Sequence, residues 1–323
     1  MRRHIFVLTT TFTDIGSCRF RHGGSEIFLD YLLEKTSASY EVTVVILIKQ
    51  SGKIVSGPRG SLRVAFVPVN LVDLFFETHS PNIIVTQSLV HSQAWDKLNT
   101  DVLSLAPHVA FILDRASQSL VDLQPNRLIY PSSWVQEAYA PADGAVLMHP
   151  VIPQERIKPS GGSGVGLVGL NAFKGFDTWQ ACARALPARQ FVGQRTAWGE
   201  QLKPQTENAS AIPYSRQMDE TFWPKVATLL MPSEFEGFGM VGHEAMARGV
   251  PVIASPGSGL DDCLGDAAVR IPRDDVVAWT RAIENVLDKK TYPLYRARAM
   301  AQANTLEQEN ALNIWFSVLS ELT

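Results

Sequence analysis

The chain has 323 residues, of which 46% are hydrophobic and 19% charged, with a formal net charge of −3. This composition supplies a substantial core, and its slight acidity argues against a general nucleic-acid or anionic-membrane binder. No apolar run approaches the roughly 20 residues of a membrane span. The length suggests two domains or one large one, and Cys18, Cys182 and Cys263, which lack metal-ligand or disulfide spacing, fit a reducing cytoplasm.

The first half alternates apolar runs with amphipathic stretches. Apolar runs without alternation are typical of parallel strands that are covered on both faces. We expect helices at residues 25–36 and 92–106. Strands are expected at residues 4–12, 42–48, 62–69, 82–87, 108–113, 127–130 and 146–149.

Residues 149–164, HPVIPQERIKPSGGSG, are rich in proline, glycine and serine, which indicates a linker. After it the same alternation starts again, so we expect two βαβ-rich domains in series. Ligands of such folds bind at the carboxyl ends of the strands, which predicts a site in the cleft between the domains. The second domain is expected to have strands at 165–170, 189–192, 228–231 and 251–254, helices at 176–186, 218–225, 241–248 and 274–288, and two further helical stretches at its end.

The stretch EGFGMVGHEAMARGVPVIAS places Glu236 and Glu244 on either side of a glycine-rich turn. Glu236 falls in the loop after the strand expected at 228–231, where a ligand should bind. Gly237 and Gly239 let the backbone turn tightly. The first N–H groups of the helix that follows suit a phosphate, and the carboxylates can accept hydrogen bonds from hydroxyls of a sugar and a ribose. The pattern therefore predicts a nucleotide-sugar site.

This E-x₇-E arrangement resembles the retaining glycosyltransferases of family 4, which have the GT-B fold. The likeness is close over residues 165–287 and loose over the first half. Further segments that match the family, in the same order, are RHGGSE (21–26), GLVGLNAFKGFDTW (166–179), FVGQ (191–194) and SGLDDCLGDAAVRIP (258–272).

The resemblance implies an α/β GT-B architecture of two Rossmann-like domains facing across a cleft. Residues 1–150 would form the acceptor-side domain and residues 151–305 the nucleotide-sugar domain, with a helix over 306–323 returning to the first. The apolar load of residues 307–322 agrees with such a return. We therefore expect truncation before Glu307 to destabilise the first domain as well as the second.

The resemblance also implies a role for each matched residue. Glu236 would hold hydroxyls of the donor sugar, Glu244 the ribose, and Lys174 the diphosphate leaving group. Glu236 and Lys174 are the expected catalytic residues, in a retaining transfer that needs no metal and no cofactor. The full set expected to bind the donor is Gly23, Gly24, Lys174, Arg195, Glu236, Gly237, Phe238, Gly239, Met240, Val241 and Glu244.

The sequence departs from the family pattern in two places. Many members carry an arginine about five positions before the lysine, but residues 169–171 here read Gly-Leu-Asn. Many also have a histidine after a strand in the middle of the first domain, where this chain has Asp114 and Arg115. A second base for the diphosphate is therefore expected from elsewhere, and Arg195, directly after FVGQ, is favoured slightly over Arg21.

Simpler interpretations of these residues remain open. Two glutamates eight apart are often a solvated face, and Lys174 could be a surface lysine, although a cation at a helix start opposes the helix dipole. His243 is expected to pack or hydrogen-bond rather than to catalyse. Asp275, with its neighbour Asp274, is expected to cap the next helix rather than to bind a metal.

Three functions remain in competition. The leading one is transfer of a sugar from a nucleoside-diphosphate sugar to an unidentified acceptor. The second is a non-catalytic GT-B partner that binds nucleotide-sugar or glycan without transfer. An NAD-dependent oxidoreductase is the third, but the first strand is not followed by G-x-G-x-x-G. The acceptor could be a small metabolite, a glycan, a protein or a nucleobase; a soluble one is favoured, because the helix SEIFLDYLLEK lacks a basic membrane-docking face.

Overall fold

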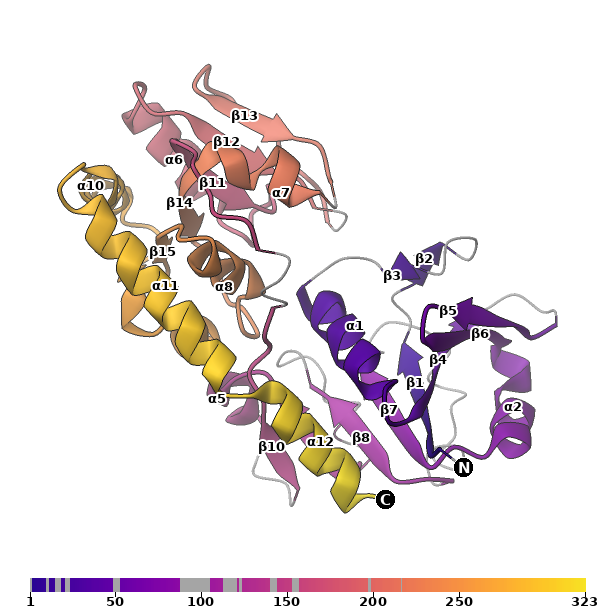
Figure 1. The fold of residues 1–323 in the computed structure, drawn as a ribbon. Coiled ribbons are helices and arrows are strands. Elements are labelled where there is room, and N and C mark those ends of the chain that lie inside the picture. Colours follow the sequence, from indigo (N-terminus) through magenta and orange to yellow (C-terminus); the bar gives the residue numbers. More distant parts are fainter. Residues whose placement is uncertain are drawn as a thin grey trace. The chain divides into compact units, whose positions relative to one another are not determined.

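The computed structural model describes residues 2–9, 12–14, 19–20, 24–48, 53–87, 105–112, 121, 124–139, 144–152, 157–196, 199–215 and 217–323. The chain divides into two compact units (Figure 1). The first unit consists of Met1–Pro150 together with Asn310–Thr323, and the second of Val151–Glu309. Each unit contains one large sheet with helices packed on it. No helix in the described part of the chain is long and apolar enough to cross a membrane.

The sheet of the first unit is parallel except for one antiparallel edge strand, β5. The order is β10-β9-β8-β7-β1-β4-β6-β5, so its parallel strands follow the doubly wound pattern, in which the sheet grows outward in both directions from β1. A separate hairpin is formed by β2 (Phe12–Asp14) and β3 (Arg19–Phe20). The strands of the sheet are β1 (His4–Thr9), β4 (Glu41–Ile48), β5 (Val55–Arg59), β6 (Leu62–Pro68), β7 (Ile83–Gln87), β8 (His108–Phe111), β9 (Arg127–Tyr130) and β10 (Ala145–Leu147).

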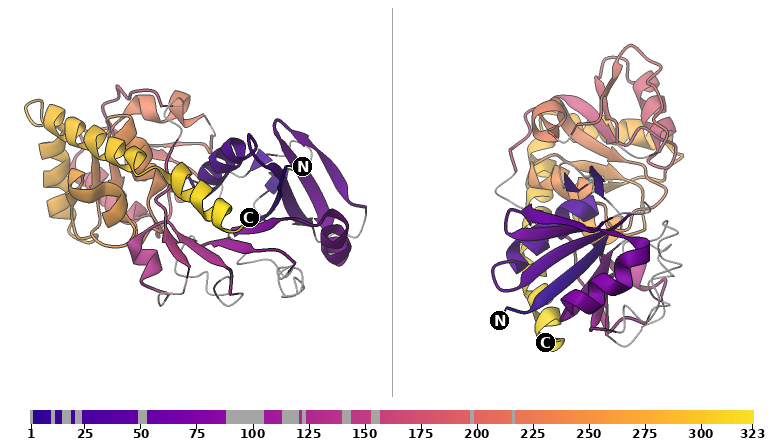
Figure 2. Two further views of the ribbon diagram at one scale, coloured as in Figure 1. Left: turned by 60° about the horizontal axis from the view of Figure 1, so that its bottom comes forward. Right: turned by 90° about the vertical axis from the view of Figure 1, so that its right-hand side faces the viewer.

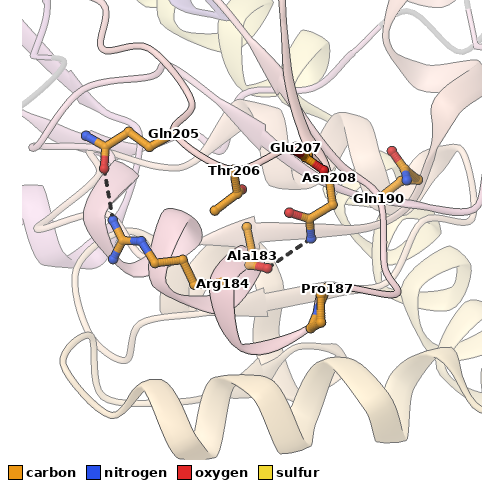
Figure 3. Close-up of a pocket in the computed structure, with 8 residues that line it drawn as sticks. All are labelled: Ala183, Arg184, Pro187, Gln190, Gln205, Thr206, Glu207 and Asn208. Carbon is orange, nitrogen blue, oxygen red and sulfur yellow. Dashed lines mark hydrogen bonds between the residues drawn. The ribbon is translucent and has the colours of Figure 1, made fainter.

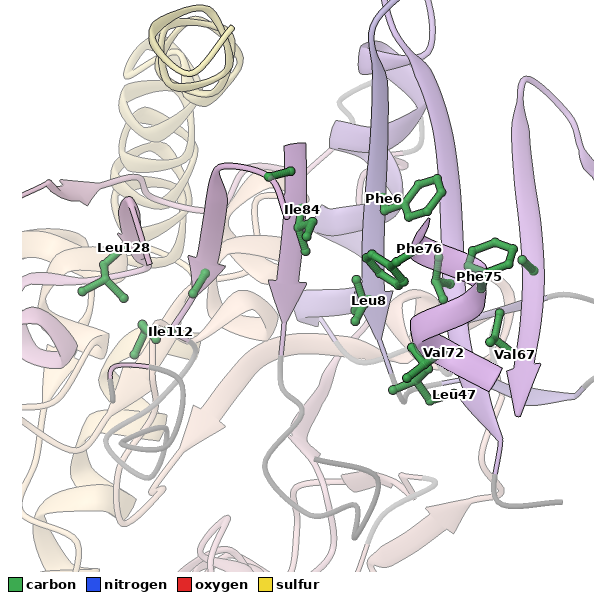
Figure 4. Packing of buried hydrophobic residues seen from close by; sticks show 14 of the residues in the cluster. Phe6, Leu8, Leu47, Val67, Val72, Phe75, Phe76, Ile84, Ile112 and Leu128 are labelled. Carbon is green, nitrogen blue, oxygen red and sulfur yellow. The ribbon is translucent and has the colours of Figure 1, made fainter. Parts of the chain in front are cut away.

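Helices cover both faces of this sheet. On one face, α2 (Val72–His79) packs Phe75 and Phe76 against Phe6 and Leu8 of β1 (Figure 4). The Phe6 and Phe75 rings stack with their centroids 5.4 Å apart. The opposite face is covered by α1 (Gly24–Thr36) and α12 (Ala311–Glu321), as Figure 2 shows. Alternate residues of each strand thus enter two different cores, as the pleat requires. A short helix, α5 (Ser133–Gln136), follows β9.

Trp315 anchors α12 in the first unit. Its side chain is fully buried, and its indole N–H donates to the Thr36 hydroxyl at the end of α1, at 2.8 Å. The Phe111 ring of β8 lies 5.6 Å from the indole ring. At the other end of α12, Glu321 forms a 2.9 Å ion pair with Arg127 of β9. The last helix is therefore a structural part of the first unit.

Substituting Trp315 with alanine should lower the stability of the first unit by about 3–5 kcal/mol, because a large buried ring and its hydrogen bond are lost together. Amide hydrogen exchange in β7 and β8 measures this loss locally. Asn313→Ala, at an exposed position of the same helix, is the control. Equal loss of protection in β11 and β12 of the second unit would contradict a role confined to the first.

The sheet of the second unit is parallel throughout, in the order β13-β12-β11-β14-β15-β16. This is the same doubly wound order, with β11 first and β14 fourth along the chain. The strands are β11 (Gly164–Val168), β12 (Phe191–Gln194), β13 (Ala209–Ile212), β14 (Val226–Met231), β15 (Val252–Ala254) and β16 (Val269–Arg270). The α-helices are α6 (Phe176–Ala185), α7 (Met218–Thr221), α8 (Met240–Ala247), α9 (Leu260–Leu264), α10 (Val276–Leu287) and α11 (Tyr292–Gln308). Short 3₁₀ turns lie at Val69–Leu71, Trp223–Lys225 and Gly265–Ala267.

Three expected elements differ from the structure for identifiable reasons. The strand expected at 189–192 begins at Phe191, because the Arg189 N–H bonds to the Leu186 carbonyl in a turn. The helix expected at 218–225 is divided into α7 and a 3₁₀ turn that contains Pro224, which has no N–H to donate. The final helix expected at 307–322 is broken at Asn310, whose φ of 56° lies in the left-handed region. Of the helix expected at 92–106, residues 92–104 lie outside the described residues, and 105–106 are not helical.

Candidate functional site

The second sheet has its topological switch point between β11 and β14. These strands are hydrogen-bonded neighbours, with β12 on the far side of β11 and β15 on the far side of β14. Loops that leave such a pair at its carboxyl ends diverge and leave room for a ligand. The loop after β11 carries Lys174, and the loop after β14 carries Glu236. The switch point thus coincides with the two residues that the sequence predicts to be catalytic.

The loops after β11 and β14 contact each other at several points. The backbone N–H of Glu234 donates to the Phe173 carbonyl at 3.0 Å. The rings of Phe173 and Phe235 meet edge to face with centroids 4.7 Å apart. Gly175 has φ 81°, and a β-carbon there would lie 2.4 Å from the Pro232 carbonyl oxygen, so only glycine allows this approach.

Lys174 and Glu236 form an ion pair at this junction. The Lys174 ammonium donates to Glu236 Oε1 at 2.5 Å, with the side chains 29% and 14% exposed. The Ser233 hydroxyl donates to the same oxygen at 2.8 Å. Within the described part of the chain, Glu236 Oε2 accepts no hydrogen bond. One carboxylate oxygen is therefore fixed by the protein, and the other can accept a hydrogen bond from a ligand.

Helix α8 begins directly after this loop, at Met240, one residue before the start predicted from the sequence. It is preceded by Gly239, whose φ of 100° is left-handed and which offers no side-chain cap. A β-carbon at Gly239 would lie 2.6 Å from Leu260 Cδ2, so the position has no room for one. The first N–H groups of a helix have no intrahelical partners, so those of Met240 and Val241 can serve an anion. The neighbouring Phe238 is buried.

Glu244 lies one turn into α8 and faces a different environment from Glu236. Its carboxyl group is desolvated by the surrounding protein although part of the residue reaches solvent, and this burial raises the pKa of Glu244 to about 7. Arg248 opposes the shift, but its guanidinium pairs with Asp219 at 2.7 Å. The arginine also donates to the Glu244 backbone carbonyl at 2.9 Å. Glu244 therefore changes charge near neutral pH.

Glu244→Gln should increase stability at pH 8 but not at pH 5. The folded-state pKa is raised from 4.5 to about 7, so wild-type stability falls as pH rises from 4.5 to 7 and is constant above that. At pH 8 the free energy of unfolding of the variant should exceed that of the wild type by at most about 3 kcal/mol, and by less if solvent reaches the carboxyl group. Urea unfolding across this pH range measures it.

The control for this substitution is Glu220→Gln, which removes a carboxylate at an exposed position of α7. If both variants changed stability with pH in the same way, the effect would come from net charge and not from the burial of Glu244.

The remaining predicted residues occupy separate positions. Arg195 follows β12 at the carboxyl edge of the sheet, where its N–H bonds to the Ile212 carbonyl at 3.0 Å. Its Nε is buried without a hydrogen-bond partner in the described part of the chain. Gly24 begins α1, whereas Gly23 and Arg21 lie outside the described residues. Their roles toward a ligand remain predictions.

Two neighbouring residues lie where the sequence places them, Asp275 at a helix cap and His243 in the packed interior. Asp275 caps α10, since its carboxylate accepts from the Ala278 N–H at 2.9 Å. His243 is fully buried in α8. Sequence reasoning missed Ser233, which bonds to Glu236, and Ser258, which accepts from the Glu236 N–H at 3.2 Å. The available signal was that each follows the carboxyl end of a strand.

A shallow pocket of about 630 Å³ lies at the opposite edge of the second sheet (Figure 3). It is formed by the end of α6 and the segments that lead into β12 and β13. Several of its polar groups are used within the protein: the Asn208 amide donates to the Ala183, Leu186 and Arg189 carbonyls, and the Arg184 guanidinium donates to Gln205. This pocket is separate from the residues discussed above.

Comparison with known sequences finds a likeness that lies mostly in the second unit. The model of the family "Family 4 Glycosyltransferase in conflict systems" matches residues 177–313. The O-antigen chain mannosyltransferase B of Escherichia coli is 37% identical over 84 residues, which are 26% of this chain and 22% of the relative. The chain resembles the family 4 glycosyltransferases. The D-inositol 3-phosphate glycosyltransferase of Mycolicibacterium smegmatis is 33% identical over 89 residues, which are 27% of this chain and 20% of the relative.

The family 4 likeness includes Glu236 and Glu244, and the matched segments span about a fifth of the curated relatives. Solved structures match the whole chain. Sucrose-phosphate synthase from Thermosynechococcus elongatus has a TM-score of 0.76 at 15% identity and covers 99% of this chain and 98% of its own. Anabaena HepE in complex with UDP-glucose has a TM-score of 0.76 at 14% identity, with 99% and 100% coverage. The fold is therefore GT-B, as predicted.

Proposed function

We propose that the chain is a retaining glycosyltransferase that moves a sugar from a nucleoside-diphosphate sugar to a soluble acceptor. The observation that carries the proposal is the Lys174–Glu236 pair, which lies in the two loops at the switch point of the second sheet. The names of the relatives support sugar transfer, and HepE with UDP-glucose supports the donor class.

In this proposal the donor separates the ion pair. The diphosphate takes the Lys174 ammonium, and Glu236 then accepts hydrogen bonds from sugar hydroxyls. The start of α8 supplies backbone N–H groups for the phosphate. Glu244, when ionised, accepts from the ribose hydroxyls. Arg195 is the proposed second cation for the diphosphate, because it directly follows β12 at the same edge of the sheet.

The reaction proceeds by attack on the same face of the sugar. The bond from the anomeric carbon to the diphosphate oxygen breaks through an oxocarbenium-like state, and a bond to the acceptor oxygen or nitrogen forms. The proton of the acceptor passes to the departing diphosphate oxygen, so no protein nucleophile is required. The main catalytic work is then the stabilisation of charge that develops on the diphosphate.

The donor can be identified by thermal shift with UDP-glucose, GDP-mannose, ADP-glucose and dTDP-glucose. A ligand that binds only the folded state adds about 2.7 kcal/mol at 100 times its Kd, so one base should raise the Tm clearly. Release of sugar from that donor then tests catalysis. Binding without release would favour a non-catalytic GT-B partner, and a panel without any shift would overturn the proposal.

Activity should survive EDTA. The proposed chemistry stabilises the diphosphate with Lys174 and backbone N–H groups, and the described residues contain no cluster of three or more His, Cys, Asp or Glu side chains that could hold a metal. Sugar release measured before and after exhaustive chelation should agree within twofold. Loss of turnover that Mg²⁺ or Mn²⁺ restores would contradict this mechanism.

A further inference from the structure

Ser258 has an unusual backbone for its residue type. It lies in the loop after β15, with φ 61° in the left-handed region. The described chain has three other non-glycine residues with positive φ, of which Ser80 and Asn310 flank helices, where such a conformation is common. Ser258 lies two residues before α9, and its hydroxyl also accepts the Leu260 N–H at 3.5 Å. A left-handed backbone in a residue with a side chain persists only where the surroundings hold it.

Ser258 also contacts the main chain of Glu236, 22 positions earlier in the chain. The Glu236 N–H donates to the Ser258 hydroxyl oxygen at 3.2 Å, and the Gly259 N–H donates back to the Glu236 carbonyl at 2.9 Å. A β-carbon at Gly259 would lie 2.1 Å from the Gly237 carbonyl oxygen, so the two loops touch. Both peptide groups of Glu236 are thus held by the β15 loop.

Glycine at position 258 would adopt the same backbone without a steric cost. Glycine cannot, however, accept the Glu236 N–H, which the serine hydroxyl does. The Glu236 carboxylate is held separately, by Lys174 and Ser233 on Oε1. The hydroxyl of Ser258 therefore fixes the backbone from which the open Oε2 oxygen is presented.

We propose that Ser258 is a positioning residue, which holds the Glu236 backbone so that Oε2 meets a hydroxyl of the donor sugar. The role rests on the proposed sugar transfer. This role predicts that loss of the Ser258 hydroxyl lowers the rate of sugar transfer. Affinity for the nucleoside diphosphate, which in this proposal does not reach Glu236 Oε2, should stay at the wild-type level.

The decisive variants are Ser258→Gly and Ser258→Ala. In Ser258→Gly the lost hydrogen bond and the relieved backbone oppose each other, so Tm should stay within about 2 °C of the wild type. Ser258→Ala keeps the strained backbone and loses the bond, so it should melt lower. Both should reduce kcat for sugar release about tenfold or more, with unchanged affinity for the nucleoside diphosphate. Ser80→Gly, the same change at a left-handed serine of the first unit, is the matched control and should keep full activity.

A double-mutant cycle gives a readout that needs no donor. Ser258→Ala should loosen the Glu236 backbone and so weaken the Lys174–Glu236 ion pair that Glu236→Gln removes. The Tm loss caused by Glu236→Gln should therefore shrink by about half in the Ser258→Ala background. Equal Tm losses in both backgrounds, or wild-type kcat in Ser258→Gly, would overturn the positioning role. A donor panel without binding would refute the proposed function alone, and the cycle would then decide on Ser258.

Discussion

Lys174→Ala should lower kcat for sugar release about 1000-fold, at the upper end of what one group that stabilises a developing anion contributes. The expected cause is loss of the ammonium that neutralises the diphosphate as it leaves. Affinity for the nucleoside diphosphate should fall, whereas affinity for the nucleoside should not. Steady-state turnover and calorimetric titration measure the two effects separately.

Lys289→Ala, at an exposed position after α10, is the control for removing a lysine. If Lys174→Ala weakened nucleoside and nucleoside diphosphate binding equally, the lysine would support the loop and not the phosphates.

Glu236→Gln should lower kcat about 100-fold while nucleotide affinity changes less than twofold. Glutamine keeps the shape of the side chain but removes the charge that pairs with Lys174 and accepts from the sugar hydroxyls. Glu234→Gln is a closely matched control, because Glu234 lies in the same loop and its side chain is 64% exposed. Equal losses in turnover and affinity would show that Glu236 serves binding in general and would remove its catalytic role.

Helices and strands with strong local signals could be placed from the sequence alone. Helix α8 could be placed because Gly239 and the apolar run after it mark its start. Strands β4 and β14 could be placed because they are apolar on both faces. Strand β13, Ala-Ser-Ala-Ile, was missed because it is a half-exposed edge strand with little apolar character. Helix α2 was missed because it is short and follows an apolar strand after only three residues.

The candidate site could be predicted as a set of residues but not as an arrangement. Glu236 was found from its position after a strand, and Lys174 from the resemblance to the family 4 glycosyltransferases. Their ion pair joins residues 62 positions apart and depends on β11 and β14 being neighbours, which only the strand order provides. The left-handed backbone of Ser258 could not be predicted from the sequence, because serine rarely adopts it and its hydroxyl bonds to the distant Glu236 N–H.

The division of the first unit into two separate segments has a consequence for biosynthesis. Its sheet is encoded before residue 150, but α12, with the buried Trp315, comes from residues 310–323. Domains usually begin to fold as they leave the ribosome, amino-terminal ones first. Here the whole second unit is translated before the first receives its last helix. Until then the apolar surface that Trp315 covers on α1 and β8 stays uncovered, so the unit made first is the last to be completed.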